Sequence, residues 1–336
     1  MFRRLGRLLS SPTSPRPAAP LPVLDAPVAM SLEERIDLAV LCRDCDILPK
    51  ANDAGAVVTD SDGARVQVMH NGLRMLADGY RGAWMTDLIR RCGGHHEPQA
   101  ERVFHEVVAR MAPDASMIEL GAWWSFYSLW FLQAHPGRTA VALEPDPERR
   151  ALGAANAARN HLAPYFLDGF IGGTEAGAVP FRLDSGQDIA IPRRTVPALM
   201  AQSGIATLDL LHCDAQGAEY DVLSSCAALL QAGRIRTVMV STHHHSISGD
   251  PLTHQRCLAV IEHCGGAVFA EHDVQESFSG DGLIAARFGP DQAACRPSRC
   301  RSTATPAACS ATRFMTSRTP GAGSGMRGSV VALIIR

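Results

Sequence analysis

The sequence contains no long apolar run, few aromatic residues and almost no lysine. No stretch of about 18 consecutive apolar residues occurs, which excludes a membrane-spanning helix. Aromatic residues make up 6%, charged residues 20% and hydrophobic residues 46% of the 336 positions. This composition excludes a chain that is disordered throughout, and the length allows one large domain or two smaller ones. Lys50 is the only lysine, whereas Ala, Gly and Arg are abundant, and we interpret this bias as GC-rich coding of a bacterial kind.

The charge is nearly balanced overall but unevenly distributed. Lys and Arg total 32 against 34 Asp and Glu, and the net charge of −2 argues against a general nucleic-acid-binding protein. Residues 1–24 hold four arginines and no acid, and the seven arginines beyond Asp291 are likewise unmatched, so the segment between them carries −13. Such an acidic body is an unfavourable surface for anionic polymers.

Composition divides the chain into four segments. Residues 1–30 form a basic, Pro-rich leader and residues 290–336 an Arg/Ser/Thr/Ala-rich tail, and we expect both to be disordered. Between them we expect a helical cap and lead-in over 31–115 and the main domain over 116–289. The leader lacks the apolar run and cleavage site of a secretory signal. Because the ten cysteines include a single CxxC, at Cys42 and Cys45, the sequence predicts reduced thiols in the cytoplasm and no metal site.

Short apolar strands alternate with helices in the main domain. In the lead-in, Ser31 and Glu34 form a capping-box pattern that opens a helix extending to Pro49, and a hairpin within 56–69 and a helix over 97–111 follow. The predicted strands of the main domain cover 116–120, 139–143, 165–170, 208–213, 237–241, 267–270 and 282–286, with helices over 127–134, 147–162, 218–232 and 252–264. This alternation predicts an α/β fold with a doubly wound, mostly parallel sheet, which binds ligands beyond the carboxyl ends of its strands.

Two of these strands end in acids placed as in nucleoside-binding sheets. Glu119 and Gly121 close the first strand, and Glu144 closes the second. The glycine allows a ligand to approach closely, and the second acid can accept both ribose hydroxyls. NAD and S-adenosylmethionine enzymes share this layout, but the loop carries one glycine where a pyrophosphate cradle needs G-x-G-x-x-G. An S-adenosylmethionine site is therefore favoured, and an NAD-dependent enzyme and a non-catalytic nucleoside-binding module are the alternatives.

Polar residues beyond the later strands are candidates for acid–base chemistry. Asp214 ends the fourth principal strand, where it can hold an ammonium group or order an acceptor hydroxyl. His243 begins a run of three histidines after the fifth strand, and imidazole titrates near neutrality, so His243 and Asp214 are the two candidates for a general base. Successive histidines point in different directions, which argues against a shared metal ion. His96 and Glu97 precede the first strand and are expected to line the cleft from above.

Four segments resemble FkbM-type S-adenosylmethionine-dependent methyltransferases: MIELGAWWSFYSLWF, VALEPDPE, LDLLHCDAQGAEYDVL and the late VSTHHH…ESFSGDGLIAARF. The resemblance spans 97–288 and implies a Rossmann-like class I fold, S-adenosyl-L-methionine as the cofactor and 116–289 as the methyltransferase domain. It further implies methyl transfer to a hydroxyl of a sugar, a glycan or a secondary metabolite, and the charge of the chain argues against a nucleic-acid partner. The chain departs from the family's first loop, where Trp123 replaces Asn and Ser125 replaces Gly, and from its later motif, where Gln216 replaces Glu.

The resemblance and the strand-end pattern together give the expected site residues. The expected cofactor contacts are Glu119, Gly121, Ala122, Tyr127, Ser128, Glu144 and Asp214. The expected catalytic residues are Asp214 and His243. The expected acceptor contacts are His96, Glu97, Gln216, Glu219 and His244. For Glu219 a structural role is the alternative, since a carboxylate at the start of a helix favours the helix dipole.

Overall fold

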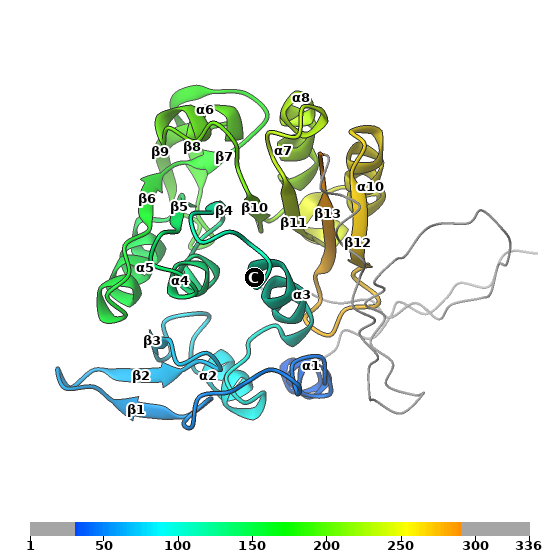
Figure 1. The fold of residues 1–336 in the computed structure, drawn as a ribbon. Coiled ribbons are helices and arrows are strands. Elements are labelled where there is room, and N and C mark those ends of the chain that lie inside the picture. Colours follow the sequence, from blue (N-terminus) through cyan, green and yellow to red (C-terminus); the bar gives the residue numbers. More distant parts are fainter. Residues whose placement is uncertain (1–30, 290–336) are drawn as a thin grey trace, which may run out of the picture.

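A seven-stranded sheet forms the centre of the structure, a computed structural model that describes residues 31–289 (Figure 1). Its strands are β4 (Ser116–Leu120), β5 (Thr139–Glu144), β6 (Tyr165–Asp168), β10 (Leu210–Cys213), β11 (Thr237–Thr242), β12 (Ala267–His272) and β13 (Gly282–Arg287). The strand order is β12-β13-β11-β10-β4-β5-β6, in which β13 runs antiparallel to both neighbours and the remaining pairs are parallel. The predicted mostly parallel α/β sheet is confirmed.

Helices cover both faces of this sheet, because alternate residues of a strand point to opposite sides. In β4, Met117 belongs to one core and Ile118 to the other. The first core packs against α3 (Pro98–Val108), α4 (Phe126–Gln133) and α5 (Pro147–Arg159). The second core packs against α6 (Val196–Gln202), α7 (Glu219–Ser225), α8 (Ala227–Gln231) and α10 (Thr253–His263). All of β4 is buried, as expected for a strand covered on both faces.

The lead-in before β4 contains a small sheet as well as helices. Its elements are α1 (Leu32–Val40), β1 (Val57–Thr59), β2 (Arg65–Val68), β3 (Arg74–Leu76) and α2 (Ala83–Arg91). The three strands are antiparallel neighbours in chain order, so the cap that was expected to be helical is mixed. The capping box of Ser31 and Glu34 opens α1, but the helix ends at Val40, well before Pro49. The CxxC cysteines lie in the irregular segment that follows, and both are free and buried.

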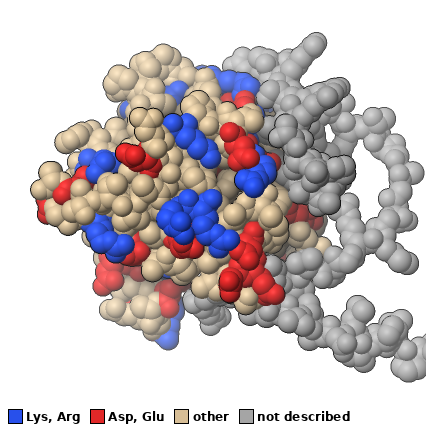
Figure 2. Space-filling model, turned by 90° about the horizontal axis from the view of Figure 1, so that it is seen from below, with Lys and Arg blue, Asp and Glu red and all other residues tan. Residues whose placement is uncertain are grey.

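Side chains fasten the small sheet to α5. The side-chain oxygens of Asn156 and Asn160 accept hydrogen bonds from backbone N–H groups of β3, each at 2.8 Å. Arg159 pairs with Asp60 at 2.5 Å and with Asp62 at 2.8 Å. Figure 2 shows the molecule from below, the side on which this sheet lies in Figure 1, and basic and acidic side chains are interspersed there. Local ion pairing of this kind gives the lead-in no large area of a single charge sign.

The main domain differs from expectation after β6, in the helix predicted over 218–232, and in the unpredicted helices α6 and α9 (His245–Ser248). The segment after β6 forms a further small sheet of β7 (Phe170–Ile171), β8 (Ala176–Arg182) and β9 (Asp188–Arg194), which the sequence analysis did not predict. Gly169, at φ +131°, interrupts the predicted strand over 165–170. The predicted helix over 218–232 is divided into α7 and α8 at Cys226. The expected leader and tail lie outside the described residues, and no helix within 31–289 has the length and apolarity needed to cross a membrane.

Candidate active site

A cavity of about 450 Å³ opens beyond the carboxyl ends of β4, β5 and β10. Parallel sheets bind their ligands at this edge, and the volume lies in the range of ordinary small-molecule sites. The expected cofactor residues that line the cavity are Glu119, Gly121, Ala122, Tyr127, Glu144 and Asp214. Of the expected acceptor residues, His96 and Gln216 line it. The wall is completed by Tyr80 and Arg81 of the lead-in and by residues 181–184 at the turn between β8 and β9, none of which the sequence analysis identified.

Glu119 projects from β4 and is anchored by Ser128. Its Oε2 accepts hydrogen bonds from the Ser128 N–H, at 2.9 Å, and from the Ser128 hydroxyl. Ser128 is buried behind Glu119 on α4 and does not line the cavity. Burial raises the pKa of Glu119 to about 8, although the bonds from Ser128 oppose the shift. The carboxyl group is therefore mostly protonated at neutral pH, and a cation bound beside it would favour its ionised form.

Gly121 lets the loop after β4 pass directly against the end of β10. Its φ of +79° favours glycine, and a Cβ at this position would meet the carbonyl oxygen of Asp214 at 1.9 Å. The N–H groups of Gly121 and Ala122 both donate to the Leu143 carbonyl at 3.0 Å. The floor of the cavity is thus made of backbone, which fits a ligand that lies flat on this loop.

Glu144 ends β5 with both carboxylate oxygens held by backbone donors. Oε2 accepts from the Trp123 N–H at 2.8 Å, and Oε1 accepts from the Asp146 N–H at 2.9 Å. Burial raises the pKa of Glu144, and these two hydrogen bonds oppose the shift. Each oxygen keeps a further lone pair, so the side chain can still accept the hydroxyl groups of a ribose in the cavity that it lines.

The loop between β4 and α4 has a left-handed backbone at two residues that are not glycine. Trp123 has a φ of +40° and Ser125 a φ of +62°. These are the positions at which the FkbM pattern noted above has Asn and Gly, the residues that adopt this conformation most readily. The Trp123 ring lies in the cavity wall, and the Arg149 guanidinium lies 3.5 Å from its centre. The loop thus presents an aromatic surface, backed by a cation, beside Glu144.

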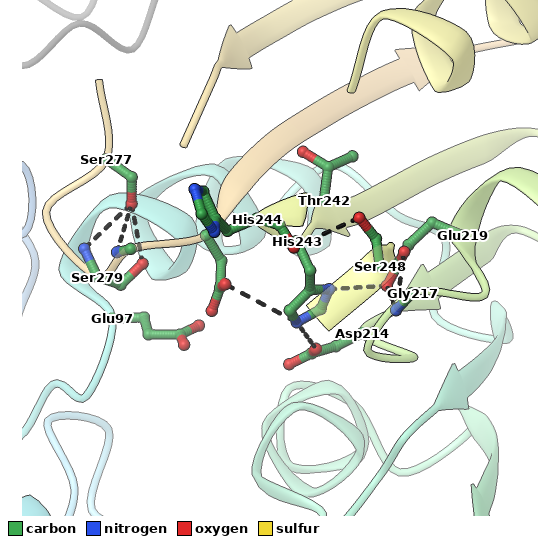
Figure 3. A network of polar contacts seen from close by, with 12 residues as sticks. Glu97, Asp214, Gly217, Glu219, Thr242, His243, His244, Ser248, Ser277 and Ser279 are labelled. Atoms are coloured by element: carbon green, nitrogen blue, oxygen red, sulfur yellow. Dashed lines mark hydrogen bonds and ion pairs between the residues drawn. The ribbon is translucent and has the colours of Figure 1, made fainter. Parts of the chain in front are cut away.

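Asp214, His243 and Glu219 form a polar chain near the end of the cavity, in which His243 and Glu219 are buried and Asp214 is half-buried (Figure 3). His243 Nε2 lies 3.1 Å from Asp214 Oδ1, and His243 Nδ1 lies 2.7 Å from Glu219 Oε1. A third carboxylate, Asp281, has its Oδ1 3.8 Å from Nε2. Burial opposes the charge of His243, but the three carboxylates raise its pKa well above the ordinary value. The imidazole is thus a cation with both nitrogens engaged, and in this state it holds no free lone pair with which to act as a base.

Three of the expected acceptor residues, Glu97, Glu219 and His244, do not line the cavity. Glu219 accepts from the Gly217 N–H at 3.0 Å in the first turn of α7, so it holds His243 and the preceding turn. His244 Nδ1 accepts from the Ser246 N–H at 3.3 Å and begins the short helix α9 (His245–Ser248). The structural alternative for Glu219 therefore fits its geometry, although its link to His243 connects it with the polar chain.

His96 and Glu97 approach the same end of the cavity from the lead-in side. Glu97 Oε2 lies 3.7 Å from His96 Nε2 and accepts a hydrogen bond from the Tyr127 hydroxyl at 3.4 Å. In Figure 3 the carboxylate of Glu97 points toward that of Asp214. Four aromatic rings have their centres 5.2 to 5.7 Å from that of the His96 imidazole: Tyr80, Trp124, Phe126 and Tyr127. The packing fixes the imidazole within the wall.

Glu101 is a buried polar hub that the sequence analysis did not identify. Its Oε1 accepts from the N–H groups of His96 and Glu97 at 2.7 and 3.1 Å, and its Oε2 lies 2.6 Å from His95 Nδ1. An acid in the first turn of a helix is equally typical of a residue that only favours the helix dipole. The adjacent His-His-Glu run was the one signal in the sequence that polar groups gather at this point.

His70, His95 and Glu101 place three possible metal-ligand atoms within 4.8 Å of one another. The two imidazole rings are stacked, with centres 4.1 Å apart and an angle of 20° between their planes. The lone pairs of nearly parallel rings do not converge on one point, whereas a metal ion requires donors that converge. This geometry favours a buried polar cluster over a metal centre.

Residues 93–266, just over half of the sequence, match the FkbM methyltransferase domain. The chain belongs to the FkbM methyltransferase family. No curated protein matches this FkbM methyltransferase at the level of sequence. With its class I sheet order, the protein is an S-adenosyl-L-methionine-dependent methyltransferase.

Solved methyltransferase structures resemble this fold at low sequence identity. The METTL16 methyltransferase domain is 13% identical, with a TM-score of 0.41, and the alignment covers 67% of this chain and 87% of that one. An O-methyltransferase from Bacillus cereus in complex with SAH is 15% identical, with a TM-score of 0.36 and coverage of 57% and 80%. TrmK of M. capricolum, in complex with S-adenosylhomocysteine, is 9% identical, with a TM-score of 0.36 and coverage of 56% and 68%.

S-adenosyl-L-methionine is the cofactor of the FkbM methyltransferase, and the cavity residues fit it. The backbone floor at Gly121 leaves no room for a side chain and suits a ligand that lies against the loop. The buried acids Glu119 and Glu144 both line the cavity, where one can face an ammonium group and the other a ribose. The loop needs no pyrophosphate cradle for such a ligand.

Proposed function

We propose that this methyltransferase methylates a hydroxyl oxygen of a small-molecule acceptor such as a sugar, a glycan or a secondary metabolite. The observation that carries the proposal is the gathering of three carboxyl groups at one end of the cofactor cavity, where Asp214 lines the wall and Glu97 and Asp281 lie beside it. Carboxylates accept hydrogen bonds from hydroxyl groups, and one of them can take the proton that an alcohol loses on methylation. The acidic body of the chain disfavours anionic polymers and so supports a neutral hydroxylated acceptor.

The cofactor residues have separate proposed roles. S-adenosylmethionine supplies an electrophilic methyl group on a positively charged sulfur. Glu144 would accept the ribose hydroxyls, and Gly121 would form the floor beneath the ligand. Glu119, held by Ser128, would face the ammonium group at the methionine end. Tyr127 would close the wall between the methionine end and the acceptor, since it lines the cavity and contacts Glu97.

Asp214 and His243 are proposed to order the reacting centre. Burial opposes the ionised form of Asp214, but the hydrogen bond and the charge of His243 lower its pKa, so the group is a carboxylate at neutral pH. Methyl transfer is an in-line displacement that requires the acceptor oxygen to be aligned with the methyl carbon. A carboxylate fixed at 3.1 Å by a buried cation supplies one rigid hydrogen-bond acceptor for this alignment.

We propose that the enzyme is bacterial and is located in the cytoplasm. The seven cysteines among residues 31–289 are free thiols, which fits a reducing compartment. Purification with and without a thiol reductant checks this point, because enzyme from a reducing compartment should gain no disulfide in the absence of oxidant.

Tritium-labelled S-adenosylmethionine tests the proposed function. The protein is incubated with neutral monosaccharides, polyols and phenols, and in parallel with amines and thiols. The expected result is a labelled methyl ether and one equivalent of S-adenosylhomocysteine. Transfer to amines or thiols alone would contradict O-methylation. Cofactor binding without transfer to any acceptor would favour the alternative of a non-catalytic nucleoside-binding module. The NAD-dependent alternative would require tight binding of NAD, which is measured by calorimetric titration of the protein with NAD.

Replacing Glu144 tests the nucleoside site. Glu144→Ala removes the proposed acceptor of both ribose hydroxyls, and hydrogen bonds to a charged group contribute about 1.5–3 kcal/mol each. We expect the dissociation constant for S-adenosylhomocysteine to rise about 100-fold in calorimetry, with an unchanged circular dichroism spectrum. Glu148→Ala, an exposed acid at the start of α5, is the matched control and should bind normally. Unchanged affinity in Glu144→Ala would remove this residue from the site.

A further inference from the structure

We propose that Glu97 is the general base that takes the proton of the acceptor hydroxyl, and that Glu101, acting through His96, holds it in position. The inference rests on the methyl transfer to oxygen proposed above, and it assigns the proton-accepting group of that reaction. From the sequence, Glu97 was expected only as an acceptor contact, and Glu101 was not identified.

The two bases expected from the sequence are already paired with each other. Both ring nitrogens of His243 face carboxylates, at 2.7 and 3.1 Å, and the ring is buried. A proton taken up by Asp214 would remove the carboxylate that lies 3.1 Å from Nε2 of the buried His243 cation, which is costly. Glu97 is not committed in this way, because the cationic neighbour His96 has its Nε2 3.7 Å away, beyond hydrogen-bond distance.

Glu97 is placed where it can reach an acceptor. It occupies the N-cap position of α3, yet its side chain makes no capping hydrogen bond. Figure 3 shows this carboxylate pointing toward Asp214, which lines the cavity. Glu97 lies beside the lining and accepts a hydrogen bond from the hydroxyl of Tyr127, a residue of the cavity wall. The Glu97 side chain keeps 16% of its surface exposed, whereas that of Glu101 has none. Glu97 is therefore partly accessible, although less so than Asp214, whose side chain is 31% exposed, and Glu101 can act only through its neighbours.

Glu101 fixes the segment that carries Glu97. One oxygen, Oε1, accepts from the backbone N–H of both His96 and Glu97 and lies 2.7 Å from His96 Nδ1. Burial opposes the charge of His96, but Glu101 raises its pKa, so the imidazolium is favoured. With the ring confined by the four aromatic side chains, Nε2 faces Glu97. His96 and Glu101 are therefore positioning residues for Glu97, and neither of them acts as the base.

Burial and the charges around Glu97 bring the pKa of its carboxyl group close to neutral pH. Burial raises its pKa to about 7, the charge of His96 opposes this, and Asp214 and Asp281 add to it. The titratable and charged groups that face this region come from the lead-in, α3, α4, the ends of β10 and β11 and the start of β13: Arg35, Tyr80, Arg81, His96, Glu101, Tyr127, Asp214, His243 and Asp281. A base whose pKa lies near the working pH combines a useful ionised fraction with sufficient proton affinity.

In the proposed step, the acceptor oxygen bonds to the methyl carbon while its O–H bond breaks and the proton passes to the Glu97 carboxylate. The electron pair of the breaking C–S bond stays on sulfur. The sulfur thereby loses its positive charge and the carboxylate loses its negative charge, so the two changes balance. The protonated Glu97 then returns its proton to water.

Infrared difference titration of the ligand-free protein tests the assignment without an acceptor. We expect carboxyl bands that titrate near pH 7 and near pH 8, from Glu97 and Glu119 respectively. Glu97→Gln should remove the first band alone, and Glu119→Gln should remove the second alone. Persistence of the pH 7 band in Glu97→Gln overturns the assignment.

Two further variants should shift the Glu97 band in opposite directions. His96→Gln removes a cation, so the band should titrate above pH 7. Asp281→Asn removes a facing anion, so the band should titrate below pH 7. A purely structural role for His96 would leave the band unmoved, and that result would remove it as a positioning residue.

Turnover of the hydroxyl acceptor selected in the labelling panel completes the test. Glu97→Gln should lower kcat by about 100-fold or more, while the affinity for S-adenosylhomocysteine stays within about twofold. The variant should also abolish the limb of the kcat–pH profile in which kcat falls below about pH 7. His96→Gln and Asp281→Asn should keep the limb but move it in opposite directions. A kcat within about threefold of the parent in Glu97→Gln overturns the role as base. A panel without any methylated alcohol contradicts the proposed function instead, and the infrared titration still decides whether the carboxyl group that titrates near pH 7 is that of Glu97.

Discussion

Ser125 combines two local costs at the start of α4. A residue other than glycine in the left-handed region costs about 1–2 kcal/mol, and Ser125 has a φ of +62°. Its hydroxyl is also buried without a hydrogen-bond partner in the described structure. Gly153 of α5 leaves the space that the hydroxyl occupies, since a Cβ there would lie 2.5 Å from Ser125 Oγ. Strained residues of this kind concentrate at functional sites, and this one supports the loop that carries Trp123 into the cavity wall.

Ser125→Gly should stabilise the protein. The variant relieves the backbone strain and removes the unpaired hydroxyl, against the entropic cost of a glycine, so we expect the free energy of unfolding to rise by about 1 kcal/mol. Urea denaturation followed by circular dichroism measures the change. Ser125→Ala keeps the left-handed backbone and should gain less. A larger gain in the alanine variant would attribute the cost to the hydroxyl and not to the backbone.

At the scale of elements, the hairpin of β8 and β9 covers one end of the cofactor cavity. Residues 181–184 line the cavity, and Phe181 stacks on Phe170 with ring centres 4.7 Å apart. The hairpin is joined to α5 through Asp184, whose Oδ2 lies 2.5 Å from Arg149 Nη2. Arg149 in turn lies over the Trp123 ring. Three elements therefore meet at Arg149 above the proposed adenosine site.

This arrangement predicts unequal effects for the two partners of the ion pair. An exposed ion pair contributes about 0–1 kcal/mol, so Asp184→Ala should weaken S-adenosylhomocysteine binding by about fivefold or less. Arg149→Ala also loses the contact with Trp123 and should weaken binding by about tenfold or more. Calorimetry measures both constants, with Asp188→Ala, an exposed hairpin acid paired to Arg182, as the matched control. Equal losses in the two variants would show that the contact with Trp123 contributes nothing.

The main strands could be predicted from the sequence and the hairpin could not, for physical reasons. The strands β4 and β5 are covered on both faces, so they are continuous apolar runs that end in acids. The strand β8 lies on the outside, with only partly buried or exposed residues, and it contains Gly177 and Pro180, which are typical of turns and not of strands. Its pairing with β9 depends on tertiary contacts that leave no periodicity in the sequence.

The candidate site was predictable to a similar extent. Glu119, Glu144 and Asp214 could be placed together because parallel strands end at one edge of a sheet. Tyr80 and Arg81 reach the same cavity from the lead-in, and no rule of local structure predicts that docking. Side-chain hydrogen bonds to β3 and ion pairs to α5 determine it.

At the scale of the whole molecule, three parts of the chain enclose one cavity. The central sheet provides the floor and the acids, the lead-in closes the end at which we propose that the acceptor binds, and the β8–β9 hairpin covers another part of the cavity. Enclosure removes water from Glu119 and Glu97, and this burial is the first cause of the raised pKa of both groups. The carboxyl groups of Glu119 and Glu97 are therefore partly protonated near neutral pH, beside the cavity in which we propose that the cationic cofactor binds.

Binding of S-adenosylmethionine should release one of these protons. The pKa of Glu119 is about 8, so at pH 7 the ligand-free protein is mostly protonated there, and a cation placed beside it favours the carboxylate. Affinity for the cofactor should therefore fall as the pH drops below 8, approaching tenfold per unit. Titration calorimetry at pH 7 in buffers of different ionisation enthalpy should count close to one proton released by the parent protein and almost none by Glu119→Gln. An unchanged count in Glu119→Gln would contradict the placement of Glu119 at the cationic end of the cofactor, because the linked proton would then come from another group in the cavity.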